Sequence, residues 1–428
     1  MNRVCVIGAG PCGLAAMKNL LQAGCRDVVC FDEGDDIGGN WAYTDDAGRA
    51  SVHECSRTIS SRRLSAFDDF PMPGHYPDFP SHRQMLAYFR AYAAAFGLGP
   101  HIRLGSRVER CALDGDDRWT VHIVAGGQTR AETFDSLVIC SGHHREASVP
   151  EYPGRFAGTI LHSSTYKRAE PFRAQRVLVV GAGNSAADIA VDVSGLATRT
   201  ALSVREGTYV VPNRIFGRPV DIVYDFWRGK LPAPLLRWGL RLWLRLAVGR
   251  WTGYGLPTPT GAPLEKPPTV SSALLDALRS GRVAARRGIA RYDGAVVEFT
   301  DGRREEFDAI VMATGFRIGF PFLPGPVVDW DPTRLYLTMM HPTIPSLYFI
   351  GLFQPIGCLW RLADHQARVA ALQISGRLRR PSGIDERIRR GAFWPRTGSS
   401  SRRAIEVDYR TLRRGLMREI AAAGISRG

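Results

Sequence analysis

The chain has 428 residues, of which 45% are hydrophobic, so it is long enough to bury a large core and to divide into two or more domains. Its formal net charge of +15 comes almost entirely from arginine. The arginines are spread along the chain without the pattern of a nucleic-acid-binding module. We therefore attribute the charge first to compositional bias and second to an anionic ligand, and we expect no nucleic-acid partner.

Neither export nor membrane insertion is expected. The first strand-like run begins at Val4, which leaves no room for the charged and apolar regions of a secretory signal. The longest apolar run, 235–248, contains three arginines and is unsuited to span a bilayer. The eight cysteines and ten histidines show no metal-ligand spacing. We therefore expect a cytoplasmic protein with reduced thiols and no metal site.

The first predicted element is a dinucleotide-binding unit. An apolar strand at 4–7 runs into the G-x-G-x-x-G pattern of Gly8, Gly10 and Gly13, and an apolar helix follows. These glycines allow a tight turn, close approach of the backbone to a pyrophosphate, and packing of the helix on the strand. The next strand ends at Asp32, where a carboxylate can accept hydrogen bonds from a ribose diol.

A loop and a linker follow this unit. Gly38, Gly39 and Trp41 form a loop suited to close contact with a flat cofactor. Further on, the stretch "FAGTILHSSTY" at 156–166 lies just before a second strand, glycine turn and helix. A histidine in such a linker is more often structural than catalytic.

The second nucleotide unit occupies "RVLVVGAGNSAADIA" at 176–190, with Gly181, Gly183 and Ala186 in the three glycine positions. Asp32 lies 24 places after Gly8, and Arg205 lies 24 places after Gly181. A guanidinium can bind a 2′-phosphate that a carboxylate would repel. The residue 24 places after each first glycine therefore predicts a dinucleotide with a non-phosphorylated ribose in the first unit and NADPH in the second.

Residues 231–250 are predicted to form an amphipathic helix with Arg237, Arg241 and Arg245 on one face. Plain packing with arginines that reach solvent is the first interpretation. A lid over a substrate channel and peripheral contact with an anionic membrane are weaker alternatives.

Two apolar strands near the carboxyl end, at 307–316 and 346–352, are expected to return to the first domain. The expected division is 1–165 for the first part of the first dinucleotide-binding domain, 166–300 for the NADPH-binding domain with a helical insert at about 210–265, and 301–428 for the returning part of the first domain. The arginine-rich tail helix should pack on the first domain or at a subunit contact, so a homodimer is an alternative to a monomer.

With these residues in place, the chain resembles class B flavin-dependent monooxygenases of the flavin-containing monooxygenase family. Phe156, Gly158, His162 and Tyr166 match the family fingerprint F-x-G-x-x-x-H-x-x-x-(Y/F). Related Baeyer–Villiger enzymes usually have tryptophan at the last position. Further matches are "DIGGNW", "DFPMP", "YPDFPSH", "GNSAADIA", "ATGF" and "HPTIPSLYFIGL".

The resemblance implies an α/β fold with two Rossmann-like domains, the NADPH-binding domain being inserted into the FAD-binding domain. FAD, NADPH and dioxygen would be used, and a small organic molecule would be oxygenated at nitrogen or sulfur through a C4a-hydroperoxyflavin. The expected FAD contacts are Gly8, Gly10, Gly13, Asp32, Gly38, Gly39, Trp41, Thr314 and Gly315. The expected NADP contacts are Gly181, Gly183, Asn184, Ser185 and Arg205. The fingerprint would couple the movements of the domains, and no side chain is assigned a firm catalytic role because the flavin carries the chemistry.

One departure from the family keeps alternatives open. Many members have an asparagine near the reactive flavin where this chain has Ile59, whose side chain cannot form hydrogen bonds. Ser60 or Ser61 could substitute for it. A Baeyer–Villiger enzyme and an NADPH oxidase or reductase without oxygenation remain alternatives. Cys358 and Trp360 are candidates for the substrate-pocket wall.

Overall fold

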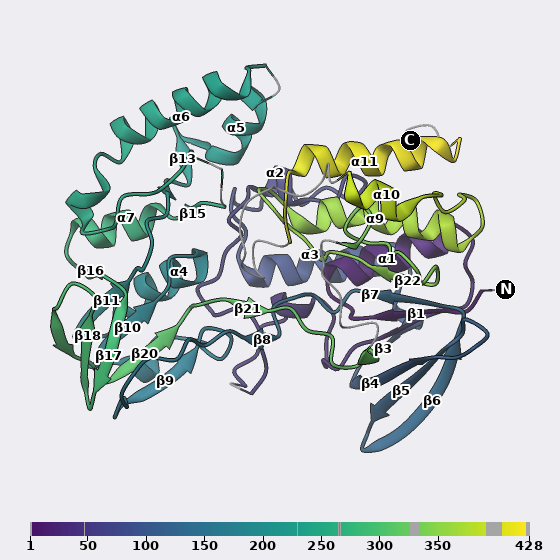
Figure 1. The fold of residues 1–428 in the computed structure, drawn as a ribbon, viewed down its shortest axis with the longest axis horizontal. Helices are drawn as coiled ribbons and strands as arrows, with labels where there is room; N and C mark the ends of the chain where they lie inside the picture. The colour runs from purple at the N-terminus through teal and green to yellow at the C-terminus, as the bar shows by residue number, and fades with distance from the viewer. Residues whose placement is uncertain are drawn as a thin grey trace.

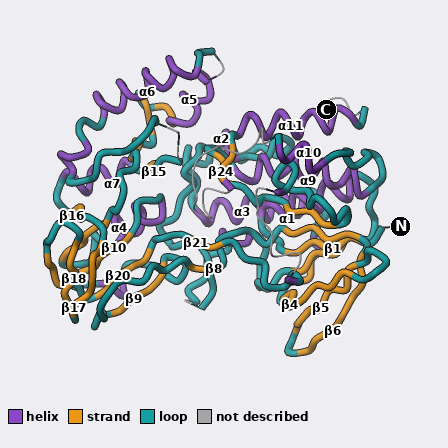
Figure 2. Tube along the Cα trace, viewed as in Figure 1, coloured by secondary structure: helices purple, strands orange, loops and turns teal. Residues whose placement is uncertain are grey.

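The computed structural model describes residues 2–424 except 47, 229, 264, 266, 326–333 and 391–404. Two α/β units lie side by side, each built on a five-stranded parallel sheet (Figures 1 and 2). The N-terminal unit carries both described ends of the chain, and the second unit carries a pair of projecting helices (Figure 1).

The first unit has the strand order β22-β7-β1-β2-β3. Its strands are β1 (Val4–Ile7), β2 (Val28–Phe31), β3 (Ile102–Arg103), β7 (Ser136–Ile139) and β22 (Leu347–Phe349). Its main helices are α1 (Pro11–Gln22), α3 (His82–Ala95) and α9 (Leu359–Ile374). An antiparallel meander is formed by β4 (Ser106–Leu113), β5 (Trp119–Ala125) and β6 (Gln128–Phe134).

Both faces of this sheet are covered, which explains why its strands are apolar without alternation. Val4 and Val6 of β1 belong to the core shared with the helices, whereas Cys5 and Ile7 belong to the core shared with the meander. The capping box of Ser81 with Gln84 fixes the start of α3. The predicted α/β fold class is confirmed.

The second unit repeats this plan with the order β16-β11-β10-β20-β9. Its strands are β9 (Thr159–His162), β10 (Arg176–Val180), β11 (Arg199–Ser203), β16 (Val283–Arg286) and β20 (Ala309–Met312). The helices α4 (Asn184–Val193) and α7 (Ser272–Arg279) contact each other and the sheet, and a second meander contains β17 (Ile289–Asp293), β18 (Val296–Phe299) and β19 (Arg304–Glu306).

This pairing corrects the expected return of 307–316 to the first sheet. β20 pairs with β10 on one side and with β9 on the other, so it belongs to the second sheet. A strand buried on both faces fits the interior of either parallel sheet, and its sequence does not say which. Only β22 returns to the first sheet. We therefore place the second unit between Phe156 and Ala313 rather than at 166–300.

The chain crosses between the units twice, and the two crossings pair with each other. β8 (Glu146–Ala147) lies on the outward crossing and β21 (Phe316–Arg317) on the return. They form a short antiparallel ladder between the two units (Figure 1). A change in the angle between the units must therefore move both crossings together.

The helical insert projects from the second unit above its sheet (Figure 1). It contains α5 (Val220–Arg228) and α6 (Ala233–Ala247). On α6, Leu240 and Leu244 face inward, whereas Leu235, Trp238, Leu242 and Leu246 are exposed together with the predicted arginines. Plain packing therefore does not explain this helix. Among the described residues, no helix is long and apolar enough to cross a membrane.

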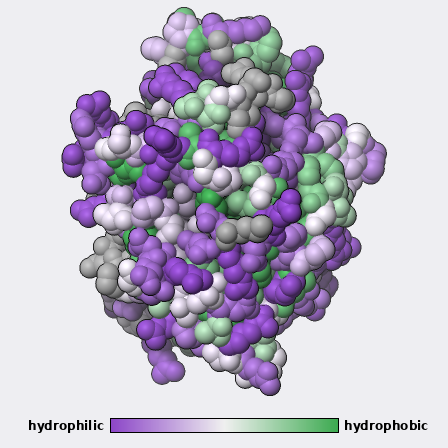
Figure 3. Space-filling view, turned by 90° about the vertical axis from the view of Figure 1, so that its right-hand side faces the viewer, coloured by the Kyte–Doolittle hydropathy of each residue, from purple (hydrophilic) through white to green (hydrophobic). Residues whose placement is uncertain are grey.

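The C-terminal helices pack on the first unit. This is one of the two positions predicted for the tail. α10 (Ile384–Arg389) and α11 (Tyr409–Ala422) lie beside α9 (Figure 1). Leu412, Leu416 and Ile420 of α11 are buried in the core shared with α1 and α9. The face in Figure 3, on the side of this unit, is mainly hydrophilic, with hydrophobic side chains in small separate groups.

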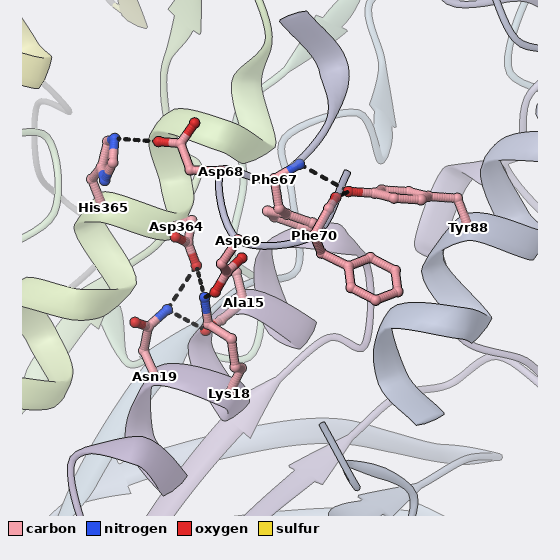
Figure 4. A network of polar contacts seen from close by, with 10 residues as sticks. All are labelled: Ala15, Lys18, Asn19, Phe67, Asp68, Asp69, Phe70, Tyr88, Asp364 and His365. Atoms are coloured by element: carbon pink, nitrogen blue, oxygen red, sulfur yellow. Dashed lines mark hydrogen bonds and ion pairs between the residues drawn. The ribbon is translucent and has the colours of Figure 1, made fainter. Parts of the chain in front are cut away.

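A buried ion pair joins distant parts of the first unit (Figure 4). Lys18 of α1 is 3% exposed and donates to Asp364 of α9 at 2.8 Å and to Asp69 at 2.7 Å. Asn19 also donates to Asp364, at 2.8 Å. Because a buried charge that loses its partner is costly, this network specifies how α9 docks on α1.

The remaining short elements lie in loops and in the insert. They are α2 (Arg62–Ser65), β12 (Val210–Val211), β13 (Arg214–Ile215), β14 (Arg218–Pro219), β15 (Thr269–Val270), β23 (Gln354–Pro355) and β24 (Glu406–Val407), with single 3-10 turns at Gly39–Trp41, Gly99–His101, Glu170–Phe172 and Trp251–Tyr254.

Candidate functional site

A cavity of about 2010 Å³ lies between the two units. Its wall includes Gly8 and Gly10 from the first glycine loop and Asn184 and Ser185 from the second. The insert contributes one face of α5, and the C-terminal region contributes residues of α9 and α11. Both predicted nucleotide motifs therefore open onto one shared space.

Two glycines of the first loop have no room for a side chain. Gly8 has φ +101°, and a Cβ there would lie 2.7 Å from the carbonyl oxygen of Cys140. A Cβ at Gly13 would lie 1.8 Å from the carbonyl oxygen of Gly8. Helix α1 starts at this loop without a side-chain cap, so its first N–H groups are free to meet an anion.

The second predicted loop lies against the first. Gly38 donates its N–H to the Ala9 carbonyl at 3.0 Å, and a Cβ at Gly39 would lie 3.1 Å from Cα of Gly10. Trp41 lines the cavity and contacts the edge of Trp360, with ring centroids 5.8 Å apart. A flat cofactor thus meets backbone on one side and aromatic rings further along the wall.

Asp32 lies at the end of β2 and lines the cavity. Its carboxylate accepts hydrogen bonds from the N–H groups of Ala9, at 2.6 Å, and Gly34, at 2.7 Å. Burial raises the pKa of this carboxyl, while these two hydrogen bonds oppose the shift. The carboxylate is therefore held in a defined position beside the glycine loop, as recognition of a ribose diol requires.

The glycine loop of the second unit has the same construction. Gly181 has φ +141°, and a Cβ there would lie 2.3 Å from the Ala313 carbonyl oxygen. Helix α4 begins after Gly183 without a side-chain cap. The side-chain oxygen of Asn184 accepts the N–H of Val270 at 2.8 Å, so this amide orients the loop around β15. Ser185 lies on the cavity wall.

The backbone shifts the expected equivalence of Arg205 and Asp32 by one residue. Gly8 N–H donates to the Phe31 carbonyl, and Gly181 N–H donates in the same way to the carbonyl of Ser203. The structural equivalent of Asp32 is therefore Val204, and Arg205 is the next residue. An apolar residue thus replaces the carboxylate, and the exposed guanidinium lies just beyond the strand.

The four fingerprint residues all dock on the second unit. Phe156 is buried against Tyr292 of the meander, with ring centroids 5.7 Å apart. A Cβ at Gly158 would lie 2.3 Å from the Asp308 carbonyl oxygen, so only glycine fits there. Tyr166 donates its hydroxyl proton to Asp192 of α4, with an O···O distance of 2.6 Å.

His162 connects the end of β9 to the returning crossing. Its Nε2 lies 2.9 Å from the Gly315 carbonyl oxygen, which can only accept, so Nε2 carries the proton. Nδ1 accepts from the N–H of Ser164 at 3.2 Å. Burial lowers the pKa of this imidazole. Both ring nitrogens are occupied, so the histidine holds the crossing rather than facing the cavity.

Thr314 and Gly315 also hold the crossings rather than line the cavity. The Thr314 hydroxyl donates to the Ser148 carbonyl at 2.5 Å, and Ser148 N–H donates to the Gly315 carbonyl at 2.9 Å. The two predicted pocket-wall residues, Cys358 and Trp360, do line the cavity.

The loop around Ile59 borders the cavity. Ile59 is 43% exposed and lies on the wall. The Ser60 hydroxyl is bonded to that of Ser65 at 2.7 Å, and Ser61 N–H donates to Asp221 at 2.6 Å. Asp221 belongs to α5, so this bond connects the two units. Its carboxyl has a raised pKa because it is buried.

Sequence reasoning did not identify Asp188 and Asp221, which both line the cavity. Burial, reinforced by the charge of Asp192, raises the pKa of Asp188 to about 7. Asp188 lies on α4 shortly after the second glycine motif. An acidic residue so close to a predicted dinucleotide site is a signal from which the sequence could have identified it. No local signal identifies Asp221, because it lies in an insert of a different unit from its partner.

The comparisons with known proteins agree with this geometry. The model of the flavin-binding monooxygenase-like family matches residues 1–423. Flavin-containing monooxygenase 5 of Oryctolagus cuniculus is 35% identical over 404 residues, covering 89% of this chain and 75% of the relative. The N-oxide-forming dimethylaniline monooxygenase 2 of Rattus norvegicus is 34% identical with the same coverage.

Solved structures share the fold at lower identity. The S-allyl-L-cysteine S-oxygenase of Allium sativum has a TM-score of 0.73 and 24% identity, and the match covers 99% of this chain and 89% of that one. An open structure of cyclohexanone monooxygenase has a TM-score of 0.73 and 17% identity, with 99% and 98% covered. The chain therefore belongs to the flavin-binding monooxygenase-like family and is a monooxygenase that uses FAD, NADPH and dioxygen.

Proposed function

We propose that the chain oxygenates a nitrogen or sulfur atom of a small organic substrate inside the cavity between the two units. The observation that carries this proposal is that both glycine loops open onto one space, so two dinucleotides can meet a third molecule there. When bound, FAD supplies the redox and oxygen chemistry. The protein binds and orients the cofactors and the substrate, and it excludes water from the cavity.

The first glycine loop suits FAD. Gly8, Gly10 and Gly13 bring backbone against the pyrophosphate at the uncapped start of α1, and Asp32 accepts from the ribose. Gly38 and Gly39 form the opposite side of this cradle, and Trp41 borders the flat ring system. Thr314 and Gly315 support the cradle indirectly, by holding the crossings beside it.

The second glycine loop suits NADPH. Gly181, Gly183 and Ser185 leave the start of α4 open to the pyrophosphate, while Asn184 orients the loop. Arg205 binds the 2′-phosphate beyond the end of β11. The fingerprint residues couple the units mechanically, because His162 fastens the returning crossing, and Tyr166 fastens the segment after β9, to the second unit.

Heteroatom oxygenation is favoured over Baeyer–Villiger chemistry, because the relatives at 34% and 35% identity are flavin-containing and N-oxide-forming monooxygenases. Tyr166 and Lys167 also replace the pattern usual in Baeyer–Villiger enzymes. An NADPH oxidase is the second candidate function. Ile59 favours it, because its side chain lines the cavity but cannot form the hydrogen bond that the family asparagine offers near the reactive flavin.

One experiment separates these functions. The holoenzyme is supplied with NADPH and either N,N-dimethylaniline or a simple thioether, and NADPH consumed, oxide formed and hydrogen peroxide released are measured together. Oxide formation that accounts for most of the NADPH supports heteroatom oxygenation. Peroxide equal to the NADPH consumed, with no oxide from any probe, identifies an oxidase instead.

The exposed face of α6 supports a proposal about location and assembly. A cytoplasmic enzyme with a peripheral contact to an anionic surface fits better than a homodimer through this helix, because a two-fold contact would bring the arginine stripes together. Flotation with anionic and neutral vesicles, together with the mass in solution, tests this assignment. A dimer that Leu242→Glu dissociates would reverse it.

A further inference from the structure

One face of α11 lines the cavity and is rich in arginine. The lining residues Arg410, Arg413, Arg414, Met417 and Arg418 recur at helical spacing, while the opposite face is buried on the first unit. A helix that only needed to pack would not require guanidinium groups at four positions on this wall. The same face therefore calls for an explanation in terms of a ligand.

Three arginines around this part of the cavity already have a carboxylate. Arg228 pairs with Asp408, Arg361 pairs with Asp68 at 2.5 Å, and Arg410 lies 3.4 Å from Asp225. These pairs join α5, α9 and α11 into a continuous wall. They do not create an excess of positive charge, because each guanidinium is balanced.

Arg413, Arg414 and Arg418 are different. Within the part of the chain that the structure describes, none of them lies within 4.0 Å of a carboxylate oxygen. Arg414 donates only to the Arg410 carbonyl and to the Thr411 hydroxyl, each at 3.4 Å. Three neighbouring positive charges on one helical face repel one another, and an anionic group placed among them would relieve that repulsion.

This face is separate from the proposed dinucleotide sites. The proposed binding sites of the two pyrophosphates are the uncapped starts of α1 and α4. Tyr409 contacts the turn at Gly357, since a Cβ there would lie 3.3 Å from the tyrosine ring. That turn leads to Trp360 and on to Trp41 beside the FAD cradle. The arginines thus border the cavity on its substrate side.

We propose that the substrate carries a carboxylate or a similar anionic group, which Arg413, Arg414 and Arg418 bind while its amine or thioether extends inward toward the flavin. This inference rests on the proposed heteroatom oxygenation. The anion takes no part in the chemistry: the heteroatom gains one oxygen atom from dioxygen, and the other leaves as water with electrons from NADPH.

Matched probes test the proposal. A series of ω-(methylthio)alkanoates and the corresponding primary amides is titrated into the holoenzyme by calorimetry, and S-oxide formation is measured in parallel. At least one acid should bind more than tenfold more tightly than its amide. In Arg413→Gln/Arg414→Gln/Arg418→Gln that preference should fall to less than threefold, whereas Arg389→Gln, an exposed arginine on α10, should keep it.

The outcomes are distinct. Acids that bind no better than amides, or a preference that survives the triple change, would overturn the anion site. Loss of binding to phosphatidylserine vesicles in the triple variant, with the acid preference intact, would assign these arginines to a membrane and also overturn it. Selective binding of acids with peroxide as the only product would leave the anion site standing and refute heteroatom oxygenation.

Discussion

Replacing Arg205 by alanine should lower the use of NADPH while leaving the use of NADH almost unchanged. The side chain is 86% exposed and its nearest carboxylate, on Glu206, is 3.9 Å away. Nothing in its described surroundings competes strongly for the guanidinium. NADH lacks the 2′-phosphate, so the arginine has no charged partner on that cofactor.

The size of the effect follows from this exposure. A hydrogen bond to a charged group contributes about 1.5 to 3 kcal/mol, and solvent around an exposed side chain reduces this to the lower end. About 1.5 kcal/mol corresponds to a roughly tenfold change in an equilibrium constant. We therefore expect kcat/KM for NADPH to fall about tenfold, mainly through KM.

The assay is the rate of flavin reduction without oxygen, measured over a range of NADPH and NADH concentrations. Arg282→Ala is the matched control, because Arg282 precedes β16 and so lies at the opposite end of the parallel sheet. Val204→Asp, which restores a carboxylate at the position equivalent to Asp32, should favour NADH further. Equal losses with both cofactors in Arg205→Ala would refute the assignment.

Three further predictions concern the cavity wall. Gly13→Ala should abolish FAD retention, because its Cβ would lie 1.8 Å from a carbonyl oxygen; purified variant with normal flavin content would contradict this. Ile59→Asn should raise the fraction of NADPH that yields oxide by severalfold, measured against peroxide; an unchanged ratio would show that this position does not control coupling. Burial raises the pKa of Asp188 to about 7, so folding favours its neutral form, and stability is lost as pH rises from the ordinary carboxyl range, about 4, to about 7. Asp188→Asn should therefore raise the melting temperature by several degrees at pH 8.5 but hardly at pH 4, and equal shifts would refute the argument.

The proposed coupling role of the fingerprint rests on particular hydrogen bonds. His162 bonds to the returning crossing, and Tyr166 bonds to α4 of the second unit. Gly158 allows the strand between them to lie against Asp308. Movement of the second unit therefore carries the fingerprint with it, and the crossings at β8 and β21 are left to bend.

The nucleotide loops could be read from the sequence because their requirements are local. A turn with φ of +101° at Gly8 favours glycine through the backbone conformation of that residue alone, and an uncapped helix start follows Gly183. The family motifs have the same local character, and they identified the flavoprotein fold and its cofactors.

The tertiary structure decided what depends on contacts between distant segments. The strand 309–312 is apolar on both faces and would fit either sheet, so only its pairing with β9 and β10 assigns it. Hydrogen bonds between strands, rather than counting, place Arg205 one residue beyond the equivalent of Asp32. The apolar stripe of α11 is buried against α9 and α1. The arginines lie on the opposite face of α11, and this docking therefore places them on the cavity wall.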